Sequence, residues 1–192
     1  VLLSDEKKLR EKDKITSKYD DLYVIDYENI EECMAAYAYY ADVAEAVEPD
    51  AFMEIASDGS EEALSGQGGA SILPDGKVRV IALLDTVASA SANVIERVSL
   101  VDEALEGHSH GNQMVQAILS QNPDAQILSI RVLGNDGRGT VSDIVSGMQY
   151  AIERGASIIN LSLSSGKNGM NAVLEAEIQK AVSQGILVVG AA

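Results

Sequence analysis

Apolar residues in the second half of the chain form short continuous runs that alternate with amphipathic segments. The runs cover residues 78–85, 126–133, 157–162 and 186–191. The amphipathic segments cover residues 110–121, 141–155 and 169–184, approximately. A continuous apolar run suits a strand that is buried on both faces of a parallel sheet. The repeated strand and helix units therefore predict an α/β fold, with right-handed crossovers and helices on both faces of a parallel sheet.

The first fifty residues show a weaker pattern. Residues 4–19 are rich in lysine, glutamate and aspartate with few apolar positions, which predicts a mostly exposed helix. Residues 22–27 predict a short strand, and residues 28–42 an amphipathic helix. Residues 43–50 predict a second strand that Pro49 ends. We expect a small α/β unit in this part of the chain.

The composition changes to glycine, serine, alanine and glutamate between residues 57 and 76, which predicts an exposed linker. The chain is thus divided into a first domain at 1–56, the linker at 57–76 and a second domain at 77–192. The last apolar run reaches the end of the sequence. Because natural domain ends are usually polar and exposed, we expect these residues to be a fragment of a longer protein.

The formal net charge of −16 argues against nucleic acid or an anionic membrane as a partner, since both favour clustered lysine and arginine. No apolar stretch approaches the length that spans a bilayer. One cysteine, Cys33, excludes an intrachain disulfide framework and a cysteine-based zinc site. Cys33 lies in the predicted helix at 28–42, where we expect a buried and inert thiol.

Asp85 and His110 are the candidate chemical groups. Asp85 ends the first buried run, at the sheet edge where ligands collect in open α/β folds. His110 opens a predicted helix, whose positive end keeps an imidazole neutral, and a carboxylate can orient such a ring as a general base. Each residue alone has a simpler interpretation, a turn cap for the aspartate and a satisfied polar side chain for the histidine. His108 is a competing imidazole, which we interpret as a loop histidine because only His110 is followed by glycine and, four residues on, by an apolar residue.

Three ordered motifs resemble the subtilisin-like serine proteases. They are VIALLDT around Asp85, HGNQMV at His110, and the block ILSIRVLGNDGRGTVSDIVSGMQYAIERGASIINLSLSSG. The resemblance implies a subtilisin-like parallel sheet and a serine endopeptidase with an Asp-His-Ser triad. In that triad Asp85 orients the imidazole and His110 acts as the base.

The resemblance also implies a peptide-binding cleft. One extended edge is formed by Gly137, Arg138, Gly139 and Thr140, and the other by Ser162, Leu163, Ser164, Ser165 and Gly166. Glycine and serine leave the backbone open to a peptide that binds as an added strand. Ala191 and Ala192 correspond to the floor of the main specificity pocket. The simpler alternative is that both edges are ordinary loops between a strand and a helix.

The first domain resembles the second half of the family's propeptide, a small α+β ferredoxin-like domain that assists folding and inhibits by occupying the cleft. A small accessory domain is the alternative. The resemblance thus implies two partners, a peptide or protein substrate and the chain's own propeptide. It favours a secreted or cell-surface location, although no signal peptide is visible.

In the family, the oxyanion asparagine and the nucleophilic serine lie beyond the part of the sequence that is present here. We therefore expect the 192-residue chain alone to be inactive. Val87 replaces a usual glycine and Asn112 a usual threonine. Valine would be strained if that position needs a positive φ, so a non-catalytic pseudoprotease or peptide-binding module remains an alternative.

We expect no cofactor. The connection between the histidine helix and the next strand is too short for the calcium loop that many relatives have there. The acidic segment from Asp85 to Glu106, taken as a loop, shows no ligand spacing that indicates calcium. A small-ligand α/β domain is a third possibility, but the glycine-rich segments 66–71 and 133–139 lack the spacing of phosphate-binding loops.

Overall fold

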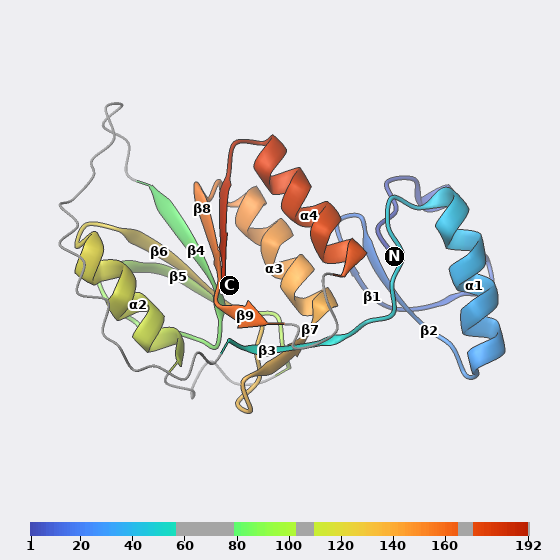
Figure 1. Ribbon diagram of the computed structural model, residues 1–192, viewed down its shortest axis with the longest axis horizontal. Coiled ribbons are helices and arrows are strands. Elements are labelled where there is room, and N and C mark those ends of the chain that lie inside the picture. The colour runs from blue at the N-terminus through green and yellow to red at the C-terminus, as the bar shows by residue number, and fades with distance from the viewer. Residues whose placement is uncertain (57–78, 103–109, 165–170, 192) are drawn as a thin grey trace.

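The computed structural model describes residues 1–56, 79–102, 110–164 and 171–191 (Figure 1). The predicted linker at 57–76 lies outside these ranges, as do His108, Ser165, Gly166 and Ala192. Within the described ranges, no helix has the length and hydropathy needed to cross a membrane.

The second half of the chain is built on a parallel sheet of five strands, in the order β10-β8-β4-β6-β5. The strands are β4 (Val80–Asp85), β5 (Val94–Ser99), β6 (Gln126–Arg131), β8 (Ile158–Leu161) and β10 (Leu187–Gly190). Strand β4 lies in the middle, and its last four residues, from Ala82 to Asp85, have no solvent exposure. The continuous apolar run therefore corresponds to a strand covered on both faces, and the predicted parallel α/β sheet is confirmed.

Helices cover both faces of this sheet (Figure 1). Helix α2 (His110–Gln121) packs its Val115 with Leu83 and Ile127 on one face. Helices α3 (Val141–Glu153) and α4 (Ala172–Ser183) lie on the other face, where Leu84 and Ile130 join their buried side chains. Alternate residues of one strand thus enter two separate cores.

Strand β5 was not predicted, because residues 86–102 were taken as part of an acidic loop. The strand lies at the edge of the sheet, and most of its residues are half-buried rather than buried. Glu96, in its middle, accepts hydrogen bonds from Tyr150 and Arg154 on the α3 side. An edge strand with polar positions gives no continuous apolar run, which explains why the pattern missed it.

The helix predicted at 4–19 is wrong. Only a short 3-10 turn, Glu6–Lys8, forms there, followed by β1 (Lys14–Tyr19), which pairs antiparallel with β2 (Leu22–Asp26). A two-residue turn joins the strands, and its Asp20 has φ of 47°. Strand β1 is almost entirely exposed, so polar side chains occur on both of its faces. The alternation of apolar and polar residues that marks a half-buried strand is therefore absent.

The strand predicted at 43–50 is also wrong. Helix α1 (Ile30–Val43) is capped by Asn29, and after it the chain makes only an isolated bridge, between Ala46 and Leu2. Leu2 also bridges Leu22, so the start of the chain occupies the position beside β2. We call residues 1–50 the N-terminal unit. Its own small core consists of Leu3, Tyr23, Ala36 and Tyr40.

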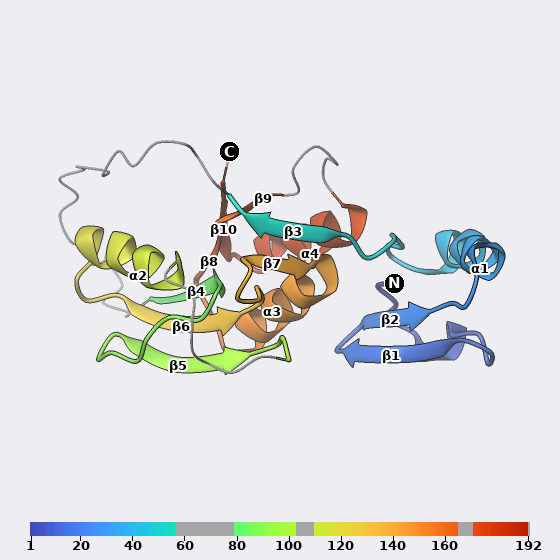
Figure 2. The ribbon, with the colours of Figure 1, turned by 90° about the horizontal axis from the view of Figure 1, so that it is seen from below.

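A second, three-stranded sheet joins the two parts of the chain (Figure 2). Strand β3 (Phe52–Ile55) pairs antiparallel with β7 (Arg138–Thr140) on one side and β9 (Leu163–Ser164) on the other. The last residues of the predicted first domain therefore lie between the two edges that the resemblance assigns to peptide binding.

Thr140 closes a capping box at the start of α3. Its hydroxyl accepts the backbone N–H of Asp143 at 3.2 Å, and the Asp143 carboxylate accepts the Thr140 N–H at 3.2 Å. We expect Thr140→Ala to lower the free energy of unfolding by about 1 kcal/mol, because an N-terminal amide of the helix loses its acceptor. Urea unfolding checks this, with Thr140→Ser as the control that keeps the hydroxyl. Equal destabilisation by both variants would contradict the capping role.

Candidate active site

Asp85 is the last residue of β4, and its side chain has no solvent exposure. Its Oδ1 atom accepts the backbone N–H of Thr86 at 2.6 Å and the Thr86 hydroxyl at 3.1 Å. Its backbone carbonyl accepts the N–H of Val132 at 2.9 Å, which ties the strand end to the segment after β6. The carboxylate is thus held in one position by its own turn.

His110 is the first residue of α2, and its ring lies against this carboxylate. Atom Nδ1 is 2.9 Å from Asp85 Oδ1 and 2.8 Å from Oδ2. The imidazole side chain is 14% exposed, so most of the ring is covered. A carboxylate at Nδ1 keeps the proton of the neutral ring on that nitrogen, which leaves Nε2 as the basic nitrogen.

Burial raises the pKa of the Asp85 carboxyl above its usual range. Hydrogen bonds from His110 and Thr86 act in the opposite direction, because they stabilise the carboxylate form. The site therefore balances the cost of a buried charge with donors aimed at it.

Gly111 lets helix α2 approach the end of β4. A Cβ atom at this position would lie 2.4 Å from the carbonyl oxygen of Thr86, too close for any side chain. Its N–H donates to the Thr86 hydroxyl at 2.9 Å. Thr86 therefore links Asp85 to the start of α2, and the close packing requires glycine after the histidine.

The two departures from the family pattern fit the structure. Among the described residues other than glycine, Asp20 alone has a positive φ, so Val87 is not strained in the way the sequence suggested. The Val87 side chain is buried. Asn112 accepts the backbone N–H of Ser89 at 2.7 Å through its Oδ1 atom, so it braces the segment that follows Asp85.

The two predicted edges are strands whose backbone groups bond to β3. Residue Met53 pairs with Gly139, and Glu54 pairs with both Arg138 and Ser164. The Gly137 carbonyl accepts the Ile55 N–H at 3.0 Å, and the Ser162 carbonyl accepts the Ala56 N–H at 3.1 Å. Leu163, buried at 7% exposure, pairs with Ile55. Each edge thus binds an extended segment through its main chain.

Ser162 connects the second edge to the histidine helix. Its hydroxyl accepts from Asn160 at 2.9 Å and contacts the sulfur of Met114, one helical turn after His110, at 3.2 Å. The N–H of Ala191 donates to the carbonyl of Leu161, the residue before Ser162, at 3.2 Å. Ala191 therefore lies beside this edge, and its side chain is exposed.

Sequence reasoning missed Thr86 and β3. A hydroxyl directly after the aspartate was a visible signal for Thr86, whereas nothing local marks residues 52–55 as a strand between two others. No group of three or more histidine, cysteine, aspartate or glutamate side chains in the described ranges is arranged to hold a metal ion.

Comparison with known proteins places these features in a family. The sequence pattern of the subtilase family matches residues 81–192, which include Asp85, His110 and both edges. Subtilisin BL of Lederbergia lenta is 36% identical over 95 residues, which are 45% of this chain and 35% of that protein. An alkaline protease of Alkalihalobacillus alcalophilus is 35% identical over 95 residues, 45% of this chain and 24% of its own length.

Pyrolysin of Pyrococcus furiosus is 44% identical over 59 residues, which are 31% of this chain and 4% of pyrolysin. The chain thus spans about a third or less of the length of these curated relatives. Because the family pattern covers more than half of the chain, the chain belongs to the subtilase family.

Proposed function

We propose that the chain is the amino-terminal part of a serine endopeptidase precursor, with Asp85 as the orienting acid and His110 as the general base. The observation that carries this proposal is the contact of His110 Nδ1 with both carboxylate oxygens of Asp85, at 2.8 and 2.9 Å. The nucleophilic serine and an oxyanion donor would come from a part of the protein outside this sequence.

In this mechanism His110 Nε2 accepts the proton of the serine hydroxyl while the serine oxygen attacks the carbonyl carbon of the substrate. Asp85 stabilises the imidazolium that forms and holds its plane. The imidazolium then donates the proton to the amine that leaves, and water repeats the sequence on the acyl-enzyme. Burial of Asp85 makes this stabilisation stronger than in water, because the dielectric constant around the pair is low.

The substrate would bind as an added strand between β7 and β9. Neighbouring residues of β3 show the two environments that such a strand meets, the buried core and the exposed surface. Met53 is 7% exposed and enters the core, while Phe52 is 64% exposed and lies near Arg138, whose guanidinium carbon is 5.4 Å from the ring centre. Main-chain bonds would give affinity and the buried position would give selectivity.

Residues 1–56 would then act as a propeptide, with β3 in the position of the substrate. This role is supported by the pairing of β3 with both edges and by the bonds of Asp21 to Gln149 of α3 and Lys180 of α4. A segment held by main-chain bonds in the cleft excludes other peptides. A secreted or cell-surface location and the absence of a cofactor are part of the same proposal, on the resemblance.

The register predicts the processing point. The Ala56 N–H bonds to the Ser162 carbonyl, and the Ser162 side chain contacts Met114 of the His110 helix, so we place the processing point at the bond after Ala56. In the longer protein with its serine, intact-mass measurement should find cleavage directly after Ala56. Met53→Asp should slow it at least about tenfold, because a buried apolar contact is lost and a charge is buried.

Phe52→Asp is the matched control, since this neighbouring side chain is exposed, and it should be processed at close to the normal rate. A cut outside residues 51–78, or equal effects of the two substitutions, would contradict the propeptide interpretation.

A peptide-binding pseudoprotease is the second candidate. The observation that favours it is that β3 is held by backbone pairing, which needs no nucleophile. Such a protein would bind peptides between β7 and β9 but would not react with reagents that label a catalytic serine.

A further inference from the structure

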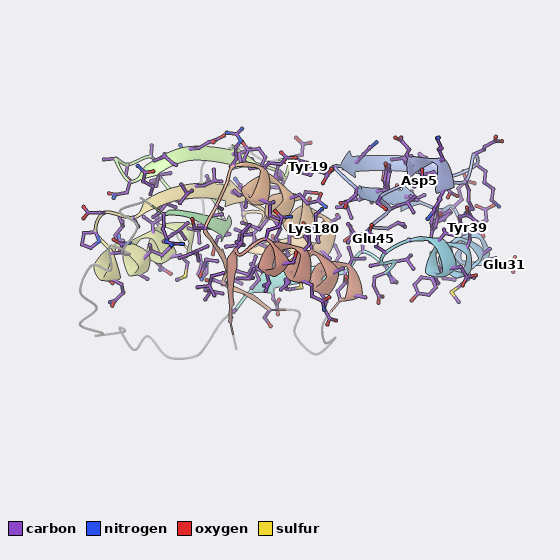
Figure 3. All side chains as sticks on the ribbon, turned by 90° about the horizontal axis from the view of Figure 1, so that it is seen from above. Asp5, Tyr19, Glu31, Tyr39, Glu45 and Lys180 are labelled. Atoms are coloured by element: carbon purple, nitrogen blue, oxygen red, sulfur yellow. The ribbon has the colours of Figure 1, made fainter. Side chains whose placement is uncertain are left out.

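The turn of the β1–β2 hairpin meets helices α3 and α4 through a cluster of charged and polar side chains. Asp20 and Asp21 form this two-residue turn. Figure 3 shows Tyr19, at the end of β1, and Lys180, on α4, where the N-terminal unit meets the helices. Leu22, the next residue, belongs to the same buried cluster as Met148 and Leu174, so the contact continues into the core.

Asp21 is held by both helices. Its Oδ1 atom accepts from Gln149 Nε2 of α3 at 2.6 Å, and its Oδ2 atom accepts from Lys180 Nζ of α4 at 3.1 Å. Lys180 Nζ is also 3.5 Å from Oδ2 of Asp20. At the edge of the contact, Tyr19 donates to Glu153 of α3 at 3.2 Å. These bonds fix the hairpin on the helices.

Glu177 of α4 lies beneath them, with no solvent exposure. Its Oε2 atom accepts from Gln149 Nε2 at 3.1 Å and is 3.8 Å from Lys180 Nζ. Its Oε1 atom and the Oε1 atom of Gln149 are both buried without a hydrogen-bond partner in the described part of the chain. A buried carboxylate with one oxygen that no donor reaches is costly, and a proton on Glu177 would remove its charge.

We infer that docking of the N-terminal unit on α3 and α4 takes up a proton at Glu177, so the unit is held more tightly at low pH and loosens as pH rises. The charged groups that face Glu177 are Asp20 and Asp21 of the turn and Lys180 of its own helix. If the N-terminal unit is a propeptide, as proposed above, a rise in pH would help to open the cleft. The linkage itself does not depend on that role.

The direction of the pKa shift agrees with this geometry. Burial raises the pKa of the Glu177 carboxyl above 4.5; Asp21 and Asp20 raise it further, and Gln149 and Lys180 lower it. A raised pKa in the docked state gives stability that is complete below the pKa of the undocked state. That stability is lost as pH rises through the docked value. One proton limits the slope to about tenfold in the docking equilibrium per pH unit.

Two amides report this docking directly. At the start of α3, the N–H of Val141 donates to the Ala51 carbonyl at 2.8 Å and the N–H of Ser142 donates to Asp50 Oδ1 at 3.0 Å. The first amides of a helix have no acceptor within it, so they exchange with solvent when these contacts open. Hydrogen exchange of the whole chain, followed by NMR from about pH 5 to 9 and corrected for intrinsic rates, measures the opening.

In the unmodified chain we expect protection of both amides to fall with pH, by up to about tenfold per unit. Glu177→Gln should be independent of pH and more protected at high pH, because its amide is neutral at every pH and takes up no proton. The matched control is Glu175→Gln, on the exposed side of the same helix, which should behave like the unmodified chain.

Constant protection in the unmodified chain, a retained slope in Glu177→Gln, or loss of the slope in Glu175→Gln would each overturn the inference. If Glu177→Gln does not fold, the pKa of Glu177 is measured in the unmodified chain from its carboxyl carbon resonance. A titration of Glu177 near pH 4.5 would overturn the proposal. No readout requires peptidase activity, so this test and the test of the proposed function can fail separately.

Discussion

Asp85→Asn is expected to lower kcat/KM about 10⁴-fold in the longer protein that carries the serine, the size of loss known for the triad aspartate of serine proteases. The amide can donate to His110 Nδ1, which turns the neutral ring to the tautomer whose Nε2 carries the proton. That ring cannot accept the proton of the nucleophile. Peptide hydrolysis measured with the purified variant checks this, with Asp124→Asn, in an exposed turn, as the control.

The loss should fall on kcat, with KM nearly unchanged. The peptide would be held by β7 and β9, which Asp85 does not contact in any described bond. A loss of only a few-fold, or one confined to KM, would contradict the role of Asp85 as the group that orients the base.

Gly111→Ala is expected to lower the free energy of unfolding by about 3 kcal/mol, because it adds an atom at a buried contact that has no space for it. The added Cβ would lie 2.4 Å from a backbone oxygen, which no change of side-chain rotamer can relieve. Helix α2 must therefore move away from β4 and carry His110 with it. A displacement of this kind also costs activity, by about 10²-fold for 1 Å.

Urea unfolding of the chain measures the stability loss. Gly190→Ala is the control for stability, because a Cβ there meets no atom within 4 Å. Equal stability of the Gly111→Ala variant and the unmodified chain would show that the helix start is not fixed against Thr86 as described.

The buried part of the fold could be predicted because its pattern is local. Strand β4 is buried from Ile81 to Asp85, so its apolar run is continuous. Helix α2 begins at His110, as the sequence pattern predicted. In both segments, whether a residue is apolar or polar mostly matches whether it is buried or exposed, so the local pattern reveals the element.

The exposed and short strands could not be predicted in the same way. Strand β1 is almost entirely exposed, and β9 has two residues, Leu163 and Ser164. Strand β3 exists because β7 and β9 lie on either side of it, more than eighty residues away in the sequence. Pairing over such distances leaves no mark in a local window.

In the candidate site too, the residues with a local motif could be predicted and the features that depend on distant packing could not. Asp85 and His110 were found through motifs, but their separation of 2.8 Å depends on the packing that Gly111 allows. Glu177 reads as one more charged residue on an amphipathic helix. It is fully buried and accepts from Gln149, which also bonds Asp21 of the β1–β2 turn, and the helix sequence alone does not reveal these contacts.

Labelling of the longer protein with a fluorophosphonate tests the central claim most directly, because the reagent reacts with a serine only when a working base activates it. We predict stoichiometric labelling that falls at least about 10²-fold in His110→Ala. An absence of labelling under conditions where a control protease reacts, or equal labelling of His110→Ala, would contradict the claim that this chain carries the acid and base of a serine peptidase.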